Sequence, residues 1–280
     1  MIQAKKLLKQ YHFQLSNDYP VEEIDAIFFK LLEFFHHIKR LDLAMNPNLQ
    51  IDEKKMLEAL KKLSHQEPWQ YITGKTEFFG LLLKVNKNVL IPRPETEELV
   101  DWIIKENQTN EKIRILDIGT GSGAIAIALA KKIQNSEVFA LDIDSKVLEI
   151  ATNNASINNV DIHFIQQNIL DDFLCKEKFD IMVSNPPYVR ESEKQQMKKN
   201  VLDFEPELAL FVSDENPLIF YDRIMDIFMK YSSRQAKLYF EINEYLKPEL
   251  TNLLQSKNFV DFEFRKDIFD KWRMLRISGQ

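Results

Sequence analysis

Beyond residue 112 the chain alternates short apolar runs with amphipathic helical segments. The runs expected to form strands cover residues 113–118, 138–141, 162–166, 179–183 and 238–242, and helices are expected from Ala124 and from Ser145. Strands that alternate with helices in this way pair in parallel and are joined by right-handed crossovers. The last two apolar segments, 260–264 and 274–277, predict a hairpin that closes the sheet edge. The sequence therefore predicts an α/β protein with a Rossmann-like sheet.

Glycine is scarce in this chain, and its distribution indicates a ligand site. Three of the six glycines fall in the run Gly119-Thr120-Gly121-Ser122-Gly123, which lies between the first expected strand and the helix that follows it. Glycines at such a position let the backbone pass close beneath a bound nucleoside. The loop is therefore predicted to bind a nucleoside cofactor.

Two acidic residues lie at the ends of the first two strands. Asp117 could fix the glycine loop or face an ammonium group, and Asp142 stands where a carboxylate can accept both hydroxyls of a ribose. This pattern leaves alternatives open. Gly119, Gly121 and Ala124 also satisfy the dinucleotide fingerprint, which would indicate an NAD(P) enzyme. A glycine-lined turn without a ligand is the structural alternative.

A proline turn after the fourth expected strand indicates the chemistry. Its sequence is Asn185-Pro186-Pro187-Tyr188. A planar nitrogen attacks poorly because its lone pair is delocalised, but the side-chain oxygen of Asn185 and the carbonyl of Pro186 can accept its N–H bonds. The prolines hold that carbonyl rigidly, and Tyr188 offers a flat face for stacking. The turn therefore predicts methylation of a planar nitrogen, with a simple strand-ending turn as the structural alternative.

The N-terminal part is expected to fold as a separate helical domain, residues 1–75. Apolar residues recur there at three- and four-residue spacing, and basic and acidic residues balance. A neutral helical unit of this kind could recognise a protein substrate. Residues 76–90, with Gly80 as a turn point, are expected to form a short strand-and-turn connector, and residues 91–280 the catalytic domain.

Composition limits the partners. The 37 basic and 43 acidic residues give a formal charge of −6, so stable nucleic-acid binding is not expected. No stretch approaches the roughly 18 apolar residues of a membrane span, and the single cysteine, Cys175, fits a reducing compartment. We therefore expect a cytoplasmic protein without membrane contact. No metal is expected either, because the adjacent His36 and His37 diverge on a helix and no cysteine or carboxylate cluster completes a ligand set.

Taken together, five segments resemble the HemK-type release-factor glutamine methyltransferases, which belong to the class I enzymes that use S-adenosylmethionine. The segments are Glu67-Pro68-Trp69-Gln70-Tyr71-Ile72-Thr73-Gly74, Leu90-Ile91-Pro92-Arg93-Pro94-Glu95-Thr96-Glu97, Leu116-Asp117-Ile118-Gly119-Thr120-Gly121-Ser122-Gly123, Asn185-Pro186-Pro187-Tyr188 and Glu205-Pro206-Glu207-Leu208-Ala209-Leu210. The resemblance therefore covers nearly the whole chain.

The resemblance implies an enzyme that methylates the side-chain nitrogen of the glutamine in the Gly-Gly-Gln tip of peptide chain release factors, with S-adenosylmethionine as cofactor. Cofactor contacts are implied for Asp117, Gly119, Thr120, Gly121, Ser122, Gly123, Asp142, Asn168, Ile169 and Asn185. Substrate contacts are implied for Asn185, Pro186, Pro187 and Tyr188, of which Asn185, Pro186 and Tyr188 are implied to be catalytic.

This chain departs from the family pattern at two positions. Asn168 stands where the family usually has an acid against the adenine amine, and Asp270 stands where a glycine is expected.

Two other functions share parts of the pattern. An N-methyltransferase acting on an exocyclic amine of DNA or rRNA would use the same turn but would normally need a basic surface. A non-catalytic protein-binding module would have no need for the intact loop and turn.

Overall fold

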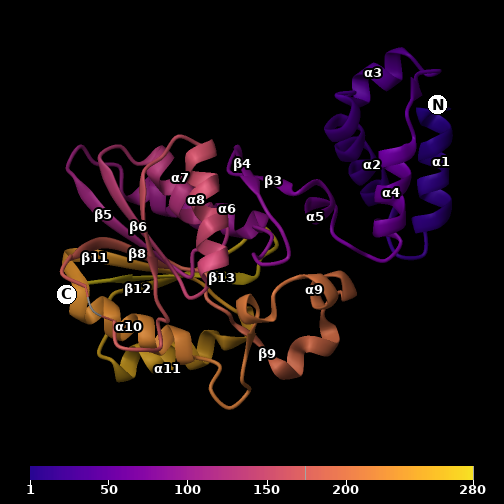
Figure 1. The fold of residues 1–280 in the computed structure, drawn as a ribbon. Helices are drawn as coiled ribbons and strands as arrows, with labels where there is room; N and C mark the ends of the chain where they lie inside the picture. Colours follow the sequence, from indigo (N-terminus) through magenta and orange to yellow (C-terminus); the bar gives the residue numbers. More distant parts are fainter. Residues whose placement is uncertain (174, 280) are drawn as a thin grey trace. The chain divides into compact units, whose positions relative to one another are not determined.

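The computed structural model of the protein describes residues 1–173 and 175–279. The chain divides into two compact units (Figure 1). The first comprises Met1–Lys75 and Lys198–Phe204, and the second comprises Thr76–Met197 and Glu205–Gln280. Each unit has a hydrophobic core of its own.

The first unit is a helical bundle. The helices of the bundle are α1 (Ala4–Leu15), α2 (Val21–His36), α3 (Arg40–Met45), α4 (Lys54–Leu63) and α5 (Trp69–Thr73), and β1 (Ile2–Gln3) pairs antiparallel with β2 (Gln50–Ile51). The short helix α9 (Lys199–Phe204) also belongs to this unit but buries no residue. Helix α1 buries Leu7, Tyr11 and Leu15, which lie on one face because they are four residues apart. The Tyr11 hydroxyl donates to the carbonyl of Met56 at 2.6 Å, and its ring packs edge-on against Phe28. The polar tip of this tyrosine is thereby satisfied within the core.

The second unit is built on a seven-stranded sheet with the order β12-β13-β11-β8-β5-β6-β7. The strands are β5 (Ile113–Ile118), β6 (Ser136–Asp142), β7 (Ile162–Gln166), β8 (Phe179–Ser184), β11 (Ser232–Glu241), β12 (Phe262–Lys266) and β13 (Trp272–Ser278). The first five of these are parallel, and β13 joins β11 antiparallel, with β12 at the edge. The predicted α/β class, with a Rossmann-like sheet and a terminal hairpin, is confirmed.

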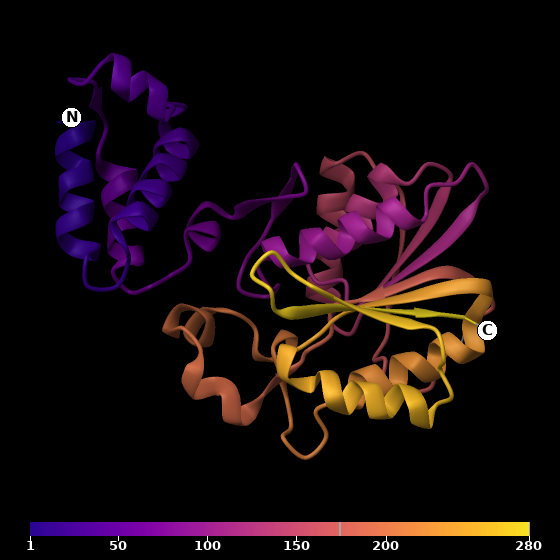
Figure 2. The ribbon, with the colours of Figure 1, turned by 180° about the vertical axis from the view of Figure 1, so that it is seen from behind.

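Helices cover both faces of this sheet. α6 (Pro94–Glu106), α7 (Ala124–Lys132) and α8 (Ser145–Ile157) lie on one face, and α10 (Ile219–Tyr231) and α11 (Lys247–Ser256) lie on the other (Figures 1 and 2). Consecutive side chains of a strand point to opposite faces, so Ile115 packs into the core beneath α6 and α7, whereas Leu116 packs into the core against α10 and α11. Strands buried on both faces are for this reason apolar at nearly every position.

Short elements connect these layers. β3 (Lys75–Phe78) and β4 (Leu81–Lys84) form a hairpin. Its turn contains Gly80 at φ 73°, the residue expected from the sequence to be a turn point. β9 (Val189–Arg190) pairs in parallel with β10 (Phe211–Val212), and three 3-10 helices cover Glu191–Gln196, Glu207–Ala209 and Glu244–Leu246. Strand β11 begins at Ser232, before the strand that the sequence predicts at residues 238–242, because Ser232 already pairs with Phe179 of β8. The mostly polar residues between Ser232 and Lys237 form an irregularity in this pairing, so the apolar pattern alone did not indicate them. Within residues 1–173 and 175–279, no helix combines the length and apolar character needed to span a membrane.

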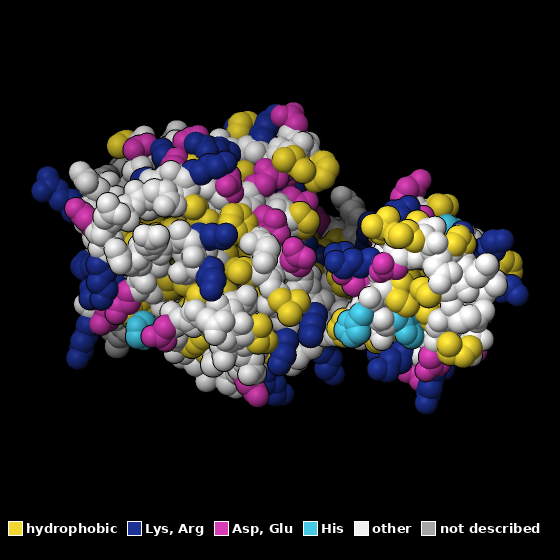
Figure 3. Space-filling model, turned by 90° about the horizontal axis from the view of Figure 1, so that it is seen from above, with side chains coloured by type: hydrophobic (Ala, Val, Ile, Leu, Met, Phe, Trp, Pro, Cys, Tyr) yellow, Lys and Arg dark blue, Asp and Glu magenta, His cyan; other side chains and the backbone are white. Residues whose placement is uncertain are grey.

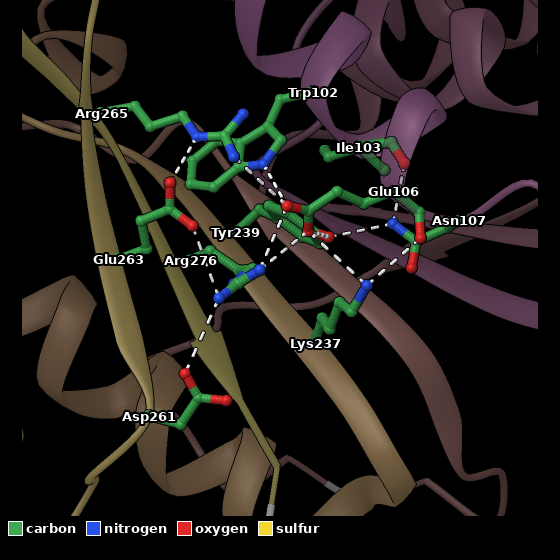
Figure 4. A network of polar contacts seen from close by, with 10 residues as sticks. All are labelled: Trp102, Ile103, Glu106, Asn107, Lys237, Tyr239, Asp261, Glu263, Arg265 and Arg276. Atoms are coloured by element: carbon green, nitrogen blue, oxygen red, sulfur yellow. Dashed lines mark hydrogen bonds and ion pairs between the residues drawn. The ribbon is translucent and has the colours of Figure 1, made fainter.

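Glu106, at the end of α6, is the centre of a polar network between that helix and the sheet (Figure 4). Trp102 Nε1 donates to its carboxylate at 2.6 Å, the Tyr239 hydroxyl at 2.9 Å and Arg276 Nη1 at 3.1 Å. Lys237 and Arg265 add ion pairs, each at 3.5 Å. Burial raises the pKa of Glu106, but these hydrogen bonds and the charge of Arg276 lower it from 4.5 to about 2. The network therefore favours the charged carboxylate in the folded state.

We expect Glu106→Gln to lower the free energy of unfolding by about 2 kcal/mol at pH 7, the scale of lost hydrogen bonds to a charged group. A carboxyl whose pKa is lower in the folded state stabilises the fold above its unfolded pKa and loses that contribution as pH falls through the folded pKa. The difference between variant and wild type should thus shrink between pH 4.5 and pH 2. Urea unfolding across this range measures it.

Glu263→Gln is the matched control. The Glu263 side chain is 40% exposed and pairs with Arg265 and Arg276 at the surface, where such pairs contribute little. A Glu106→Gln deficit that was the same at pH 3 as at pH 7 would contradict the assignment of this carboxylate as a charged anchor.

Candidate active site

A cavity of about 450 Å³ opens at the carboxyl ends of the parallel strands. Its walls are contributed by the loops that follow β5, β6, β7 and β8, together with residues 87–96 and 206–209. Strand β5 lies at the centre: the chain continues from it to β6 and β7 on one side and returns to β8 on the other. Ligands of open α/β sheets bind at this kind of topological switch point.

The structure brings most of the sequence-predicted site residues into this one cavity. Those in its wall are Gly119, Thr120, Gly121, Ser122, Asp142, Asn168, Ile169, Asn185, Pro186 and Pro187. Three predicted residues, Asp117, Gly123 and Tyr188, do not line the cavity. Asp117 and Gly123 each form a hydrogen bond with Thr120 of the wall, and Tyr188 directly follows Pro187 in the chain. The loop predicted to bind a nucleoside and the turn predicted to bind a planar nitrogen are therefore neighbours.

The glycine loop is held against β6 and leaves open space in front of it. The N–H groups of Gly119 and Thr120 both donate to the carbonyl of Leu141, at 2.8 and 2.9 Å. A Cβ on Gly121, at φ 55°, would meet no atom within 4 Å, whereas a Cβ on Gly123, at φ 83°, would lie 3.0 Å from Ile127 and 3.3 Å from Ala151. Gly121 thus faces the cavity, and Gly123 permits the close packing of α7 on α8.

Asp117 lies beneath the loop and is completely buried. Its Oδ2 accepts the Thr120 hydroxyl at 2.7 Å and the Ala126 N–H at 3.2 Å. Its Oδ1 is buried with no hydrogen-bond partner in the part of the chain that the structure describes. Burial raises the pKa of Asp117 to about 7. Of the two roles that the sequence left open, this geometry favours fixing the loop.

Asp142, at the end of β6, has its carboxylate in the cavity wall. One oxygen accepts the Gly121 N–H at 3.0 Å and the other accepts the Asp144 N–H at 3.3 Å. Burial raises the pKa of Asp142 despite these bonds. An ionised carboxylate has about four acceptor positions, so capacity remains for two hydroxyls of a ribose. Its position beside the glycine loop therefore fits a nucleoside.

The wall that follows β7 has an apolar surface and an amide. Ile169 and Leu170 line the cavity beside Ile143. The Asn168 side-chain oxygen accepts the Leu170 N–H at 3.1 Å, which fixes the asparagine in a local turn. This part of the wall therefore combines apolar side chains with an uncharged amide.

The proline turn is anchored to the centre of the sheet. The Ser184 hydroxyl donates to the carbonyl of Ile118 at 2.7 Å, which ties the end of β8 to the end of β5. Asn185, Pro186 and Pro187 follow directly in the cavity wall. The Tyr188 ring packs against the core on the α10 side and its hydroxyl donates to Glu241 at 2.9 Å. Burial raises the pKa of Tyr188, so the phenol stays protonated and acts as a donor.

Sequence reasoning missed four polar residues at the site, namely Arg93, Thr96, Glu205 and Glu241. Arg93 pairs with Glu205 at 2.5 Å, and the Ile91 N–H donates to the same carboxylate at 3.2 Å. This contact joins two of the segments that carry the family resemblance. The resemblance singled out Arg93, Thr96 and Glu205 as parts of motifs, but nothing local in the sequence indicates their partners. Glu241 lies outside every motif and is 2% exposed.

The loop between β12 and β13 explains the departure at Asp270. Asp270 adopts φ 62°, the left-handed conformation for which a glycine is expected. Asp267 holds the turn, since its Oδ1 accepts the N–H groups of Phe269 and Lys271 and its Oδ2 accepts Arg273 Nε at 3.2 Å. The loop therefore keeps the conformation without the glycine.

Among the described residues, no group of three or more histidine, cysteine, aspartate or glutamate side chains could hold a metal ion.

The two glycines of the loop give a paired stability test. A Cβ in the left-handed region costs about 1–2 kcal/mol, and overpacking adds about 1–3 kcal/mol. We expect Gly123→Ala to lower the free energy of unfolding by about 3 kcal/mol and Gly121→Ala by only about 1 kcal/mol, because only the former adds a clash. Chemical unfolding of both variants measures the difference. An equal loss of unfolding free energy in the two variants would mean that the packing of α7 on α8 does not require a residue without a side chain at position 123.

Family models match both parts of the chain. The methyltransferase small domain matches residues 97–204, and the PrmC N-terminal domain matches residues 6–74.

Curated relatives match along nearly the whole chain. A release factor glutamine methyltransferase of Flavobacterium psychrophilum is 48% identical over 97% of this chain and 99% of its own length. One of Bacteroides thetaiotaomicron is 42% identical over 94% of this chain and 96% of its own.

Solved structures share the fold at low sequence identity. A methyltransferase from Pyrococcus furiosus is 18% identical with a TM-score of 0.50, covering 81% of this chain and 96% of that chain. A T. thermophilus 16S rRNA methyltransferase, solved with AdoMet and guanosine, is 16% identical with a TM-score of 0.52, covering 74% of this chain and 50% of that chain.

Proposed function

Because this chain belongs to the release factor glutamine methyltransferase family, we propose that it transfers a methyl group from S-adenosylmethionine to the side-chain nitrogen of a release-factor glutamine. The main observation behind this proposal is that the glycine loop, Asp142 and the turn at Asn185 line one and the same cavity. A nucleoside site and a set of amide-binding acceptors meet there. The glutamine concerned is that of the Gly-Gly-Gln tip.

We assign the cofactor contacts to the loops that follow β5, β6 and β7. Asp142 would accept the ribose hydroxyls, the loop from Gly119 to Gly123 would run beneath the nucleoside, and Asn168 and Ile169 would border the adenine. Asp117 would contribute by fixing the loop through Thr120. When bound, S-adenosylmethionine supplies an electrophilic methyl group. The open space before Gly121, in the cavity wall, fits an occupied cavity.

We assign the substrate amide to the turn. The Asn185 side-chain oxygen and the Pro186 carbonyl would accept the two N–H groups of the glutamine amide, which orients its nitrogen and favours the developing positive charge. Pro187 keeps the turn rigid, and Tyr188 supports it from behind through Glu241. No general base is needed before attack, because the nitrogen becomes acidic only as it gains positive charge. Positioning can supply about 7–11 kcal/mol of the barrier reduction.

We assign the part from residue 1 to residue 75 as a recognition domain, residues 76–90 as a connector and residues 91–280 as the methyltransferase domain. The match of residues 6–74 to a family-specific N-terminal domain supports this division. The first unit also exposes a large aromatic side chain, since Phe13 on α1 is 85% exposed. An exposed aromatic side chain on a neutral unit fits contact with a protein.

Release factors are the proposed partner, and the cytoplasm, where they act, is the proposed location. Basic and acidic side chains are intermixed on the face shown in Figure 3. The formal charge of −6 likewise disfavours a polyanionic substrate. DNA or rRNA amine methylation is therefore not favoured.

The proposal predicts where the methyl label appears. Purified enzyme, S-adenosylmethionine and a release factor should give one methyl group on the Gly-Gly-Gln glutamine, as read by mass spectrometry of the peptide. A release factor with Gln→Glu at that position should accept none, because it lacks the nitrogen. Label on DNA or rRNA, with none on the release factor, would overturn the proposal.

Asp142→Ala tests the cofactor assignment. We expect the affinity for S-adenosylmethionine to fall by about 2–3 kcal/mol, the scale of lost charge-assisted hydrogen bonds. Calorimetry measures the change. Asp161→Ala removes an exposed aspartate before β7 and is the matched control, with unchanged affinity expected. An affinity equal to that of the wild type in Asp142→Ala would refute the assignment.

Asn185→Ala tests the amide assignment. We expect kcat to fall by about 10²-fold or more, as when a transition-state hydrogen-bond partner is removed. The affinity for S-adenosylmethionine should fall much less. Rapid-quench kinetics and calorimetry on the same preparation separate the two effects. Equal losses would identify Asn185 as chiefly a cofactor ligand.

A further inference from the structure

Glu241 is a buried carboxylate placed beside the proline turn by strand pairing. Strand β11 runs parallel to β8, and Phe240 is the register partner of Ser184. The next residue along each strand is therefore Glu241 on one side and Asn185 on the other. Glu241 is 2% exposed and is not part of the cavity wall, so it can act on a ligand only through other residues.

The two oxygens of this carboxylate are bound by two different segments. Oε2 accepts the hydroxyl of Thr96, from the first turn of α6, at 2.6 Å. Oε1 accepts the hydroxyl of Tyr188, from the proline turn, at 2.9 Å. Burial raises the pKa of Glu241, whereas these two bonds and the charge of Arg273 lower it. Because the acceptor is shared, the start of α6 and the proline turn are held at one place.

Thr96 forms the link to Asn185. Its hydroxyl has a single proton, and that proton is donated to Glu241. Toward any other neighbour its oxygen can only accept, and Asn185 Nδ2 donates to it at 3.4 Å. Both Thr96 and Asn185 lie in the cavity wall, so this contact is made at the edge of the site.

The direction of these bonds selects one of two orientations for the Asn185 amide. The NH2 and carbonyl ends of an asparagine side chain have nearly the same shape, so packing alone distinguishes them poorly. A hydroxyl that can only accept binds the NH2 end. The carbonyl oxygen is then left free as an acceptor, which is the group that a substrate N–H requires.

We propose that Thr96 and Glu241 are positioning residues which orient the Asn185 amide so that its oxygen, rather than its NH2 group, meets the substrate amide. The inference rests on the proposed function, since it assigns a role within that methyl transfer. In the reversed orientation the Asn185 NH2 would oppose the substrate N–H groups, donor against donor. Loss of the Thr96 hydroxyl should therefore lower turnover without removing any residue that contacts the glutamine in the proposed complex.

The test compares Thr96→Val with Thr96→Ser. Valine matches the shape of threonine without the hydroxyl, and serine keeps the hydroxyl. We expect Thr96→Val to lower kcat by about 10- to 100-fold, with the KM for the release factor and the affinity for S-adenosylmethionine changed by less than about threefold. Thr96→Ser should restore kcat to within about threefold of the wild type. Thr251→Val, which removes a hydroxyl bonded to Lys247 within α11, is the matched control and should leave kcat unchanged.

A double-variant cycle decides whether Thr96 acts through Asn185. If it does, Thr96→Val should change kcat by less than about twofold in a chain that already carries Asn185→Ala. The same reasoning applies to Glu241→Gln, since a single amide cannot present two carboxylate oxygens to Thr96 and Tyr188. Glu241→Gln should lower kcat in the wild-type chain and have little further effect beside Asn185→Ala. It also serves as the second variant if Thr96→Val does not fold, as judged by thermal unfolding.

Either of two results would overturn the inference. One is wild-type turnover in Thr96→Val and Glu241→Gln. The other is that Thr96→Val and Glu241→Gln lower kcat by the same factor in the wild-type chain and in the Asn185→Ala chain. That result would mean that Thr96 and Glu241 do not act through Asn185. A wild-type enzyme that does not methylate the release factor at all would instead refute the proposed function, so the two failures are distinguishable.

Discussion

The site depends on the parallel pairing of β5 with β8 and β6. Parallel strands end at the same edge of a sheet, so the glycine loop after β5, Asp142 after β6 and the proline turn after β8 all reach one edge. The bond from the Ser184 hydroxyl to the carbonyl of Ile118, at 2.7 Å, fixes the last residues of β8 and β5 side by side. A shift of this register by one residue would turn the side chains of β8 to the opposite faces and move Asn185 away from the loop. The positions of the glycine loop, Asp142 and Asn185 therefore depend on this strand pairing.

Buried carboxylates then fix the segments around that edge. Asp117 binds the glycine loop, Glu205 binds Arg93, and Glu241 binds the first turn of α6 and the proline turn. A buried charge is costly unless donors satisfy it, so each of these groups is stable only when its partner segment is in place. Burial raises the pKa of both Asp117 and Glu241, because it disfavours the charged form of each carboxyl group. Such a site is arranged before the substrate arrives, as catalysis by positioning requires.

The sequence indicated the sheet and the terminal hairpin because these depend on local periodicity. It indicated the glycine loop because glycine adopts the left-handed backbone of that loop more readily than other residues. It did not indicate the partners of Thr96 or Arg93, since Thr96 meets Glu241 across 145 residues and Arg93 meets Glu205 across 112. No local pattern encodes contacts at such separation. It also did not indicate the environment of Tyr188. The expectation of a stacking surface came from the flat ring alone, whereas the structure packs that ring on the core and binds its hydroxyl to Glu241.

In the proposed reaction, an uncharged amide nitrogen is methylated because fixed acceptors of the proline turn hold it. A crystal structure of the enzyme with S-adenosylhomocysteine and a release factor would reveal how the glutamine is held. We expect the glutamine nitrogen to lie within about 3 Å of both the Asn185 side-chain oxygen and the Pro186 carbonyl, the usual distance of such hydrogen bonds. A glutamine bound with its nitrogen against an ionisable side chain, and with Asn185 and Pro186 out of reach, would show that the proline turn does not hold the substrate amide.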